Sequence, residues 1–279
     1  MTQLTLTKHH GLGNDFLVVF HPQVDDLPAL ARALCDRRRG VGADGLLVGE
    51  AADGYAARMV LINADGSRAE MSGNGIRCFA QALAMRRGDH DPQLLITDAG
   101  ERVVELTLTD SPSLVLAAVD MGSVDPIDEP ADWAALGCDP LRPVSHLSLG
   151  NPHSVVAVDD VLAVDLLGLG TRVPYVNLEI IEPGPEPHAI TMRVHERGAG
   201  ITEACGTGAC ASAWAAEVWG MVPAGIQEIV VHMDGGDAKV RMHHPSPGRV
   251  TLVGPAQYVA TVTVDTDHLL ADTQLATPG

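Results

Sequence analysis

Aromatic residues are scarce in this sequence. Among its 279 residues there are three Phe, three Tyr and three Trp, which together make up 3%. So few rings leave little material for a platform that stacks nucleic-acid bases, or for an aromatic cage around a cation. Positive charge is also scarce, because 18 Lys and Arg face 36 Asp and Glu, for a net charge of −18. We therefore expect no nucleic-acid partner and no binding to an anionic membrane.

Lysines and long apolar runs are nearly missing as well. The two lysines are Lys8 and Lys239, and Lys239 lies in an alternating stretch typical of a strand surface. A pyridoxal phosphate Schiff base is therefore not expected. The longest apolar runs, such as residues 16–20, are far too short to span a bilayer, and the first residues contain no apolar signal region. These features predict a cytoplasmic protein.

The sequence also lacks a recognisable metal or dinucleotide motif. Its five cysteines are odd in number and scattered, without CxxC spacing, so neither a disulfide framework nor a structural zinc site is indicated. The adjacent histidines at 9–10 and 243–244 would point to opposite faces of a strand and have no third ligand. The GxGxxG spacing at residues 40–45 lacks the preceding strand and following helix. We expect no metal and no cofactor.

Short strand-like runs separated by Gly, Asp and Pro turns dominate the chain. Helical patterns occur at residues 27–37, 75–87 and 208–219, which predicts an α/β (α+β) protein. The length favours two domains. A segment rich in Asp, Pro and Gly, residues 120–143, predicts the crossover between them. We expect one domain of residues 1–120, completed by 264–279, and a second of 121–263.

A weak internal repeat supports two similar halves. Ser72-Gly-Asn-Gly aligns with Cys205-Gly-Thr-Gly at an offset of 133 residues, and Leu12-Gly-Asn aligns with Leu149-Gly-Asn at an offset of 137. Each copy of the first motif precedes an expected helix. Two matches in the same order at nearly equal offsets indicate a duplicated α/β unit.

The two repeated loops have the chemistry of an anion site. A glycine-rich turn that leads into a helix exposes backbone N–H groups at the positive end of the helix dipole, where a carboxylate or phosphate binds. Ser72 and Cys205 would flank that anion, and a thiol in this position is expected to have a lowered pKa. The alternative interpretation is that the glycines only make tight turns and that Cys205 is a small buried apolar residue. Duplication of the whole element favours the anion site.

Over nearly its entire length the sequence resembles the diaminopimelate epimerase family. The matching stretches occur in the family's order, at residues 10–16 (HGLGNDF), 36–45 (DRRRGVGADG), 63–67 (NADGS), 73–78 (GNGIRC), 150–153 (GNPH), 196–200 (ERGAG) and 204–210 (ACGTGAC). The resemblance implies two similar domains related by a pseudo-twofold axis, each a curved sheet around a central helix. It also implies an active site in the cleft between them, and homodimers are common in the family.

The implied activity is cofactor-independent inversion at an amino-acid α-carbon, between LL- and meso-diaminopimelate, in lysine and cell-wall precursor synthesis. In the family one thiolate removes the α-proton while a thiol on the opposite face donates another. By resemblance Cys205 is one of these thiols, and His153 and Glu196 lie where the family has residues that help the cysteines exchange protons. Dense electrostatic support for the carbanion would come from the two helix N-termini, so no metal or organic electron sink is required.

Ser72 departs from the family, which has its second catalytic cysteine at this position. A serine hydroxyl is a much weaker acid than a thiol, so two-thiol chemistry does not follow directly. Cys78 is close in sequence but matches a family position that is not the catalytic one. Three explanations stay open: a cysteine changed to serine to block catalysis or prevent a disulfide, a natural Ser/Cys enzyme, and a homologue that binds without inverting. Ser/Cys pairs occur in the similar proline-racemase-like enzymes.

The resemblance also assigns residues that bind substrate. The family holds the distal amino-acid end of its substrate with asparagines and an arginine, a set suited to a zwitterionic group. The matching residues here are Asn63, Asn151, Asn177 and Arg197, and those matching positions around the reacting centre are Asn14, Gly73, Asn74, Gly206 and Thr207. One corner departs from the family, because its Gly-Glu-Thr is Gly200-Ile-Thr here.

Two rival functions remain. The first is a related amino-acid racemase or lyase that uses Cys205 as its sole thiol base, with Ser72 supplying a hydrogen bond. A lyase would release an alkene or keto acid. The second is a silent amino-acid-binding homologue, which would bind ligand without exchanging its α-hydrogen.

Overall fold

The chain divides into two compact units, each described here by itself. The computed structural model describes residues 3–266 and residue 269. The first unit comprises residues 1–117 together with the chain from Pro255 onward, and the second comprises Ala118–Gly254. The expected boundaries at 120 and 264 therefore lie too late. The crossover is not in the segment 120–143, because the chain passes between units inside two continuous strands, β8 (Leu114–Ser123) and β17 (Arg249–Asp265).

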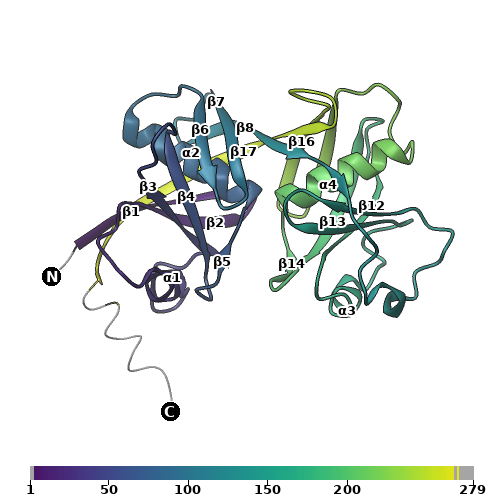
Figure 1. Ribbon diagram of the computed structural model, residues 1–279, viewed down its shortest axis with the longest axis horizontal. Helices are drawn as coiled ribbons and strands as arrows, with labels where there is room; N and C mark the ends of the chain where they lie inside the picture. The colour runs from purple at the N-terminus through teal and green to yellow at the C-terminus, as the bar shows by residue number, and fades with distance from the viewer. Residues whose placement is uncertain (1–2, 267–268, 270–279) are drawn as a thin grey trace, which may run out of the picture. The chain divides into compact units, whose positions relative to one another are not determined.

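The two units repeat one sequence of elements, and the expected α+β fold of two similar domains is confirmed (Figure 1). The first contains β1 (Gln3–Gly11), β2 (Asn14–Phe20), α1 (Leu27–Cys35), β3 (Gly45–Glu50), β4 (Ala57–Asn63), β5 (Arg68–Ala69), α2 (Gly73–Arg87), β6 (Gln93–Thr97) and β7 (Gly100–Leu108). The second contains β9 (Asp125–Pro126), a 3-10 turn (Trp133–Leu136), β10 (Val144–Ser148), β11 (Pro152–Ala157), α3 (Leu166–Gly170), β12 (Asn177–Pro183), β13 (Ala189–Glu196), β14 (Gly200–Thr202), α4 (Gly206–Val218), β15 (Glu228–Met233) and β16 (Gly236–Met242).

Strand pairing confirms the duplication. In the first unit β1–β2 is antiparallel, β2–β3 parallel, β3–β4 antiparallel, β4–β6 parallel and β6–β7 antiparallel. The second unit repeats these directions through β10–β11, β11–β12, β12–β13, β13–β15 and β15–β16. Position by position, β2 therefore corresponds to β11 and β3 to β12.

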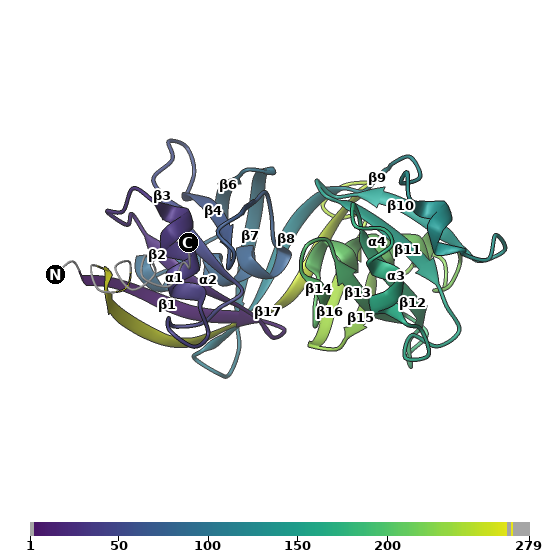
Figure 2. The ribbon, with the colours of Figure 1, turned by 90° about the horizontal axis from the view of Figure 1, so that it is seen from below.

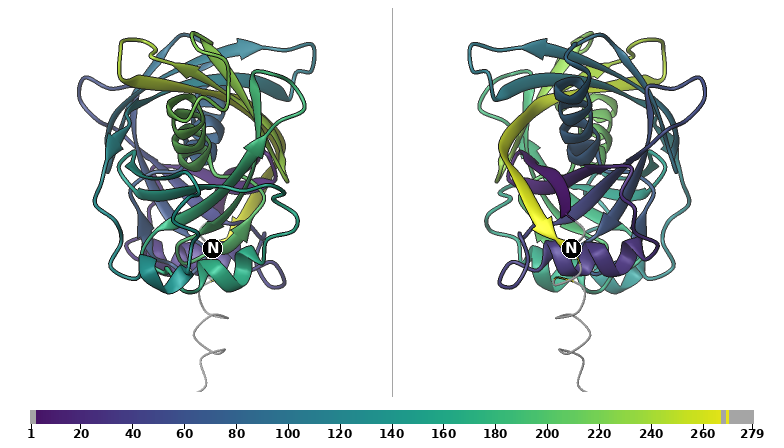
Figure 3. Two further views of the ribbon diagram at one scale, coloured as in Figure 1. Left: turned by 90° about the vertical axis from the view of Figure 1, so that its right-hand side faces the viewer. Right: turned by 90° about the vertical axis from the view of Figure 1, so that its left-hand side faces the viewer.

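A long helix lies inside the curved sheet of each unit, α2 in the first and α4 in the second (Figure 3). Both are buried around their circumference in their first three turns, and strands contact them on several sides. Such a helix needs small residues, and α4 supplies them with five alanines, two glycines and a serine. Both helices begin two residues earlier than the sequence pattern predicts, so Ser72 and Cys205 become their N-cap residues.

A second, shorter helix covers the outer face of each sheet. The helix α1 lies against β3 and β4, and α3 lies against β12 and β13 (Figure 2). The N-cap residue of α1 is Asp26, whose carboxylate accepts the Ala29 N–H at 2.9 Å, and the helix buries Leu30 and Leu34 fully. With a helix on each face, β3 and β12 are buried over almost their whole length instead of alternating.

His9 gives the first unit a measurable pH dependence. Its ring is fully buried between Gln81, at 2.8 Å from Nδ1, and Thr7, at 2.9 Å from Nε2, and burial lowers its pKa to about 4. As the pH falls below 6.5 the unfolded chain binds a proton that the folded protein excludes, so the free energy of unfolding should fall by up to about 3 kcal/mol between pH 6.5 and 4. Urea unfolding at several pH values measures this slope. The variant His9→Gln should flatten it, and an unchanged slope in that variant would assign the effect to other groups.

Candidate functional site

Ser72 and Cys205 occupy equivalent N-cap positions. The Ser72 Oγ accepts the Gly75 N–H at 3.0 Å, and the Cys205 Sγ accepts the Gly208 N–H at 3.4 Å. Their backbones share one extended conformation, with φ and ψ of −138° and 123° at Ser72 and of −127° and 114° at Cys205. Each side chain therefore lies at the positive end of a helix, next to N–H groups that the helix itself leaves free.

The pKa of the Cys205 thiol is shifted in the direction opposite to the prediction. Burial raises its pKa well above the usual value, and the nearby carboxylates of Glu196 and Glu179 raise it further. The hydrogen bonds from Thr207 and Gly208 lower it but do not compensate. The predicted lowering of the pKa is therefore wrong, because desolvation and two carboxylates outweigh the local effect of the helix N-terminus. The surroundings of Cys205 in this structure therefore favour the neutral thiol.

A chain of hydrogen bonds connects Cys205 to His153. The Thr207 Oγ1 lies 3.5 Å from the Cys205 Sγ and accepts from the Asn151 Nδ2 at 3.2 Å. The Asn151 Oδ1 lies 3.1 Å from Nε2 of His153. Four residues named by the sequence analysis therefore meet in the second unit. Thr207 and His153 are buried, and Asn151 is half-buried.

Glu179 completes this chain and was not predicted. Its Oε1 lies 2.6 Å from Nδ1 of His153, and both side chains have no exposed surface. Burial raises the Glu179 pKa, which the charge and the hydrogen bond of His153 oppose. The carboxylate also lies close to the N-terminus of α4, since a Cβ added to Gly208 would be 2.7 Å from Oε1. The signal available in the sequence was an acidic residue flanked by Leu178 and Ile180 in the strand β12.

Three further expected residues lie at the ends of neighbouring strands in the same unit. Glu196 accepts a hydrogen bond from the hydroxyl of Thr202, the last residue of the Gly200-Ile-Thr segment, in which isoleucine replaces the family's glutamate. The buried Asn177 accepts the backbone N–H of Arg197 at 2.8 Å and donates to the Pro152 carbonyl at 3.2 Å. The side chain of Arg197 is exposed. Asn177 therefore positions the loop that carries the arginine.

The first unit contains the other expected residues. The Asn74 Nδ2 donates to the Asn14 Oδ1 at 3.2 Å, and the Asn14 Nδ2 donates to Asp44 at 2.7 Å. Gly73 is the first residue of α2, as Gly206 is of α4. Asn63 ends β4 and donates to the Ser67 Oγ at 3.0 Å within a turn. Among the described residues no hydrogen bond connects the Asn63 side chain to the other expected site residues.

Arg77 is a second residue that sequence reasoning missed as a functional candidate. It is fully buried inside the first unit, where Nη2 donates to the Asn74 Oδ1 at 2.7 Å and Nη1 to the Gly73 carbonyl at 3.0 Å. Its Nε donates to the Pro255 carbonyl at 3.2 Å. Arg77 thus holds the first turn of α2 against the strand β17.

Cys78 does not replace the missing thiol. It has no exposed surface, and burial raises its pKa to about 12. Both properties agree with the sequence interpretation, which found it a poor substitute at this position.

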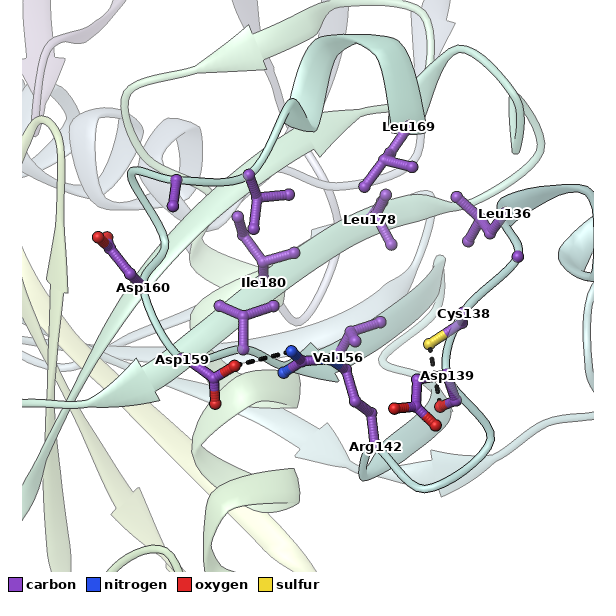
Figure 4. Close-up of a pocket in the computed structure, with 14 residues that line it drawn as sticks. Leu136, Cys138, Asp139, Arg142, Val156, Asp159, Asp160, Leu169, Leu178 and Ile180 are labelled. Atoms are coloured by element: carbon purple, nitrogen blue, oxygen red, sulfur yellow. Dashed lines mark hydrogen bonds and ion pairs between the residues drawn. The ribbon is translucent and has the colours of Figure 1, made fainter.

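The described part of the chain contains no cluster of three or more His, Cys, Asp or Glu that could hold a metal ion. Within that part no helix is long and apolar enough to cross a membrane. A cavity of about 440 Å³ lies in the second unit, with an apolar floor of Val156, Leu178 and Ile180 and an Arg142–Asp159 ion pair of 2.8 Å at its rim (Figure 4). Its described lining includes none of the expected site residues.

Comparisons with known proteins agree with these observations. The sequence matches the family model of diaminopimelate epimerase over residues 6–127 and 146–259. A diaminopimelate epimerase of Desulfitobacterium hafniense is 37% identical, over 92% of this chain and 96% of that protein. One of Pelotomaculum thermopropionicum is 38% identical, over 91% and 96%.

Solved structures with low sequence identity share the fold. A predicted epimerase of Pseudomonas aeruginosa superimposes with a TM-score of 0.73 at 15% identity, over 94% of this chain and 99% of that one. A hydroxyproline epimerase of Agrobacterium vitis, solved with trans-4-hydroxy-L-proline bound, gives a TM-score of 0.69 at 15% identity, over 95% and 91%.

Proposed function

Because the chain belongs to the diaminopimelate epimerase family, we propose that it interconverts LL- and meso-diaminopimelate by exchanging the α-proton without a metal or organic cofactor. The observation that carries this proposal is Cys205, a thiol at the N-cap of a buried helix and within 3.5 Å of the Thr207 hydroxyl. A proton carrier in that position can act at a carbon whose carboxylate is bound by the helix N-terminus. A role in lysine and cell-wall precursor synthesis, in a cytoplasmic homodimer, goes with this proposal.

The proposed proton carriers are Cys205 and Ser72, one from each unit. The α-proton leaves the substrate for a thiolate or alkoxide on one face, and the carbanion receives a proton from the hydroxyl or thiol on the other. Negative charge then develops on the α-carboxylate, and backbone N–H groups at the starts of α2 and α4 would stabilise it. His153 and Glu196 would assist proton exchange at Cys205.

The charges around Cys205 support an amino-acid substrate. Glu196 and Glu179 raise the pKa of the thiol, so the site favours a cationic group beside it. The α-ammonium group of an amino acid supplies that charge and would make the thiolate easier to form. We propose Asn14, Gly73, Asn74, Gly206 and Thr207 around the reacting centre, and Asn63, Asn151, Asn177 and Arg197 at the distal end.

Because position 72 is a serine, one alternative is a one-thiol enzyme, in which Cys205 alone removes and returns the proton. Incubation with LL- and, separately, meso-diaminopimelate in D₂O distinguishes these functions when α-deuterium uptake is followed by NMR and configuration by chiral chromatography. The proposed function predicts exchange with inversion. Exchange without inversion would indicate a single base, release of an alkene or keto acid would indicate a lyase, and tight binding without exchange would indicate a binding protein.

A further inference from the structure

Burial of the Glu179 carboxyl group is energetically unfavourable. A carboxylate without exposed surface loses its hydration, and it persists in a fold when it is paired or fulfils a role. Here one oxygen is bonded to His153, while Oε2 is buried and has no hydrogen-bond partner among the described residues. The carboxylate therefore has a single described hydrogen bond, and that bond is directed at a residue of the proposed site.

The duplicated fold provides an internal comparison. In the parallel pair β2–β3, Phe16 lies opposite Gly45, and in the equivalent pair β11–β12, His153 lies opposite Asn177. Two residues further along, the first unit has Leu47 where the second has Glu179. The contacts of the helix glycines agree, because a Cβ on Gly75 would meet Leu47 whereas one on Gly208 would meet Glu179. The His–Glu pair thus occurs beside the thiol, and the apolar Phe–Leu pair occurs beside the serine.

The hydrogen bonds from His153 to Cys205 all run in one direction. Because the Asn151 Nδ2 donates to Thr207, its Oδ1 faces His153 and accepts from Nε2–H. The Thr207 oxygen accepts from Asn151, so its own proton is available to the Cys205 sulfur at 3.5 Å. This arrangement favours the thiolate, and it requires the His153 ring to carry a proton on Nε2. Burial favours the protonated form of Glu179, whose O–H donates to Nδ1 at 2.6 Å and so leaves the ring proton on Nε2.

We propose that Glu179 is a positioning residue for proton transfer at Cys205. It holds His153 with Nε2–H toward Asn151, and through Asn151 it directs the Thr207 hydroxyl at the sulfur. This inference rests on the proposed function and names a residue that acts through His153 and not on the substrate. The ionisable groups near Cys205 are Glu179 on β12, Glu196 at the end of β13 and His153 on β11.

Two uncharged substitutions test the hydrogen bond that Glu179 makes to Nδ1 of His153. In Glu179→Gln an amide N–H can donate to Nδ1, which keeps the Nε2–H tautomer. Glu179→Leu removes the bond and introduces the residue that the first unit has at the equivalent position. We expect Glu179→Gln to retain α-hydrogen exchange within about tenfold and Glu179→Leu to lower kcat by about 100-fold or more with little change in KM. The pH at half-maximal kcat/KM should be higher in Glu179→Leu than in Glu179→Gln.

Coupling through the chain is tested by adding Glu179→Leu to Thr207→Val, in which the hydroxyl is already missing. If Glu179 acts through His153 and Thr207, the second substitution should lower the rate by less than about threefold. Additive losses would overturn the proposal, and so would equal losses in Glu179→Gln and Glu179→Leu or pH profiles that coincide.

A readout without substrate keeps the inference separate from the proposed function. Nitrogen-15 NMR of the histidine rings, assigned through the signals lost in His153→Gln, reports which ring nitrogen carries the proton. The Nε2–H form should dominate in the native protein and in Glu179→Gln and should give way to mixed tautomers in Glu179→Leu. The same spectrum in all three would overturn the positioning role, whether or not the protein exchanges protons with diaminopimelate. Absence of exchange in the native protein with the expected spectra would instead contradict the proposed function.

Discussion

Cys205→Ser is expected to lower the rate of α-hydrogen exchange by about 10³-fold or more while leaving the fold intact. The loss follows because a hydroxyl is a far poorer proton acceptor than a thiolate, and general acid–base groups contribute about 10²- to 10⁴-fold to rates. Stability should change little, since Ser72 shows that a serine caps the same kind of helix with a 3.0 Å hydrogen bond. Deuterium uptake in D₂O and a thermal unfolding curve measure the two effects.

The matched control is Cys138→Ser. Cys138 is a half-exposed thiol at the rim of the cavity in the second unit, away from the described contacts of Cys205. Its replacement should leave exchange within about twofold, because it takes no part in general acid–base catalysis. Exchange that survives in Cys205→Ser at the native rate would exclude Cys205 as the proton carrier and with it the proposed mechanism.

Ser72→Cys is expected to raise the rate of inversion by about 100-fold or more. The reason is acidity, because a thiol near pKa 8.5 gives and takes protons at neutral pH far more readily than an aliphatic hydroxyl. The new side chain should fit, since Ser72 and Cys205 share one backbone conformation and accept the same hydrogen bond from the backbone N–H of the fourth residue of the motif. Ser72 is also less buried than Cys205, so its sulfur would pay a smaller desolvation penalty as a thiolate.

Ser72→Ala serves as the comparison for this gain. It removes the hydroxyl without adding a thiol, so its rate of inversion should not exceed that of the native protein. Chiral chromatography of both reaction directions under reducing conditions measures all three proteins. Equal rates of inversion in Ser72→Cys and Ser72→Ala would show that position 72 carries no proton, and the enzyme would then be one that uses a single base.

Local patterns in the sequence predicted the parts of the site that lie in short loops. The two glycine-rich turns at Ser72 and Cys205 can be recognised because a turn, a cap and the following helix are adjacent in the chain. Even there the helices began two residues early, since the sequence pattern marks where apolar spacing starts and not where the backbone turns helical. The acidity of Cys205 was predicted wrongly for a related reason: the helix dipole is local, whereas burial and the carboxylate of Glu179 depend on other strands of the unit.

Glu179 and Arg77 show what local patterns miss. An acidic residue between Leu178 and Ile180 normally indicates the solvent face of a strand, but β12 is covered on both faces, by α3 on one side and by α4 on the other. Burial of Arg77 likewise depends on the carbonyl of Pro255, which is far away in sequence. The domain boundaries predicted at 120 and 264 lie later than the true ones because β8 and β17 continue through the true boundaries as unbroken strands. The Gly254-Pro255 pair at the second boundary lies within β17 and makes no turn.

The last strand of the first unit comes from the C-terminal part of the chain, which has a consequence for folding during synthesis. The strand β1 pairs with the part of β17 from Gln257 to Asp265, near the very end of the described chain. During translation the first unit therefore cannot complete its sheet until its last strand has been synthesised. By then residues 118–254, the second unit, have already been synthesised. The second unit can therefore fold before the first, which reverses the order of translation. During that interval one edge of β1 exposes unpaired backbone groups, which makes it the segment most exposed to aggregation or chaperone capture. A circular permutant that joins residues 255–265 ahead of β1 would remove the delay and should give a higher soluble yield.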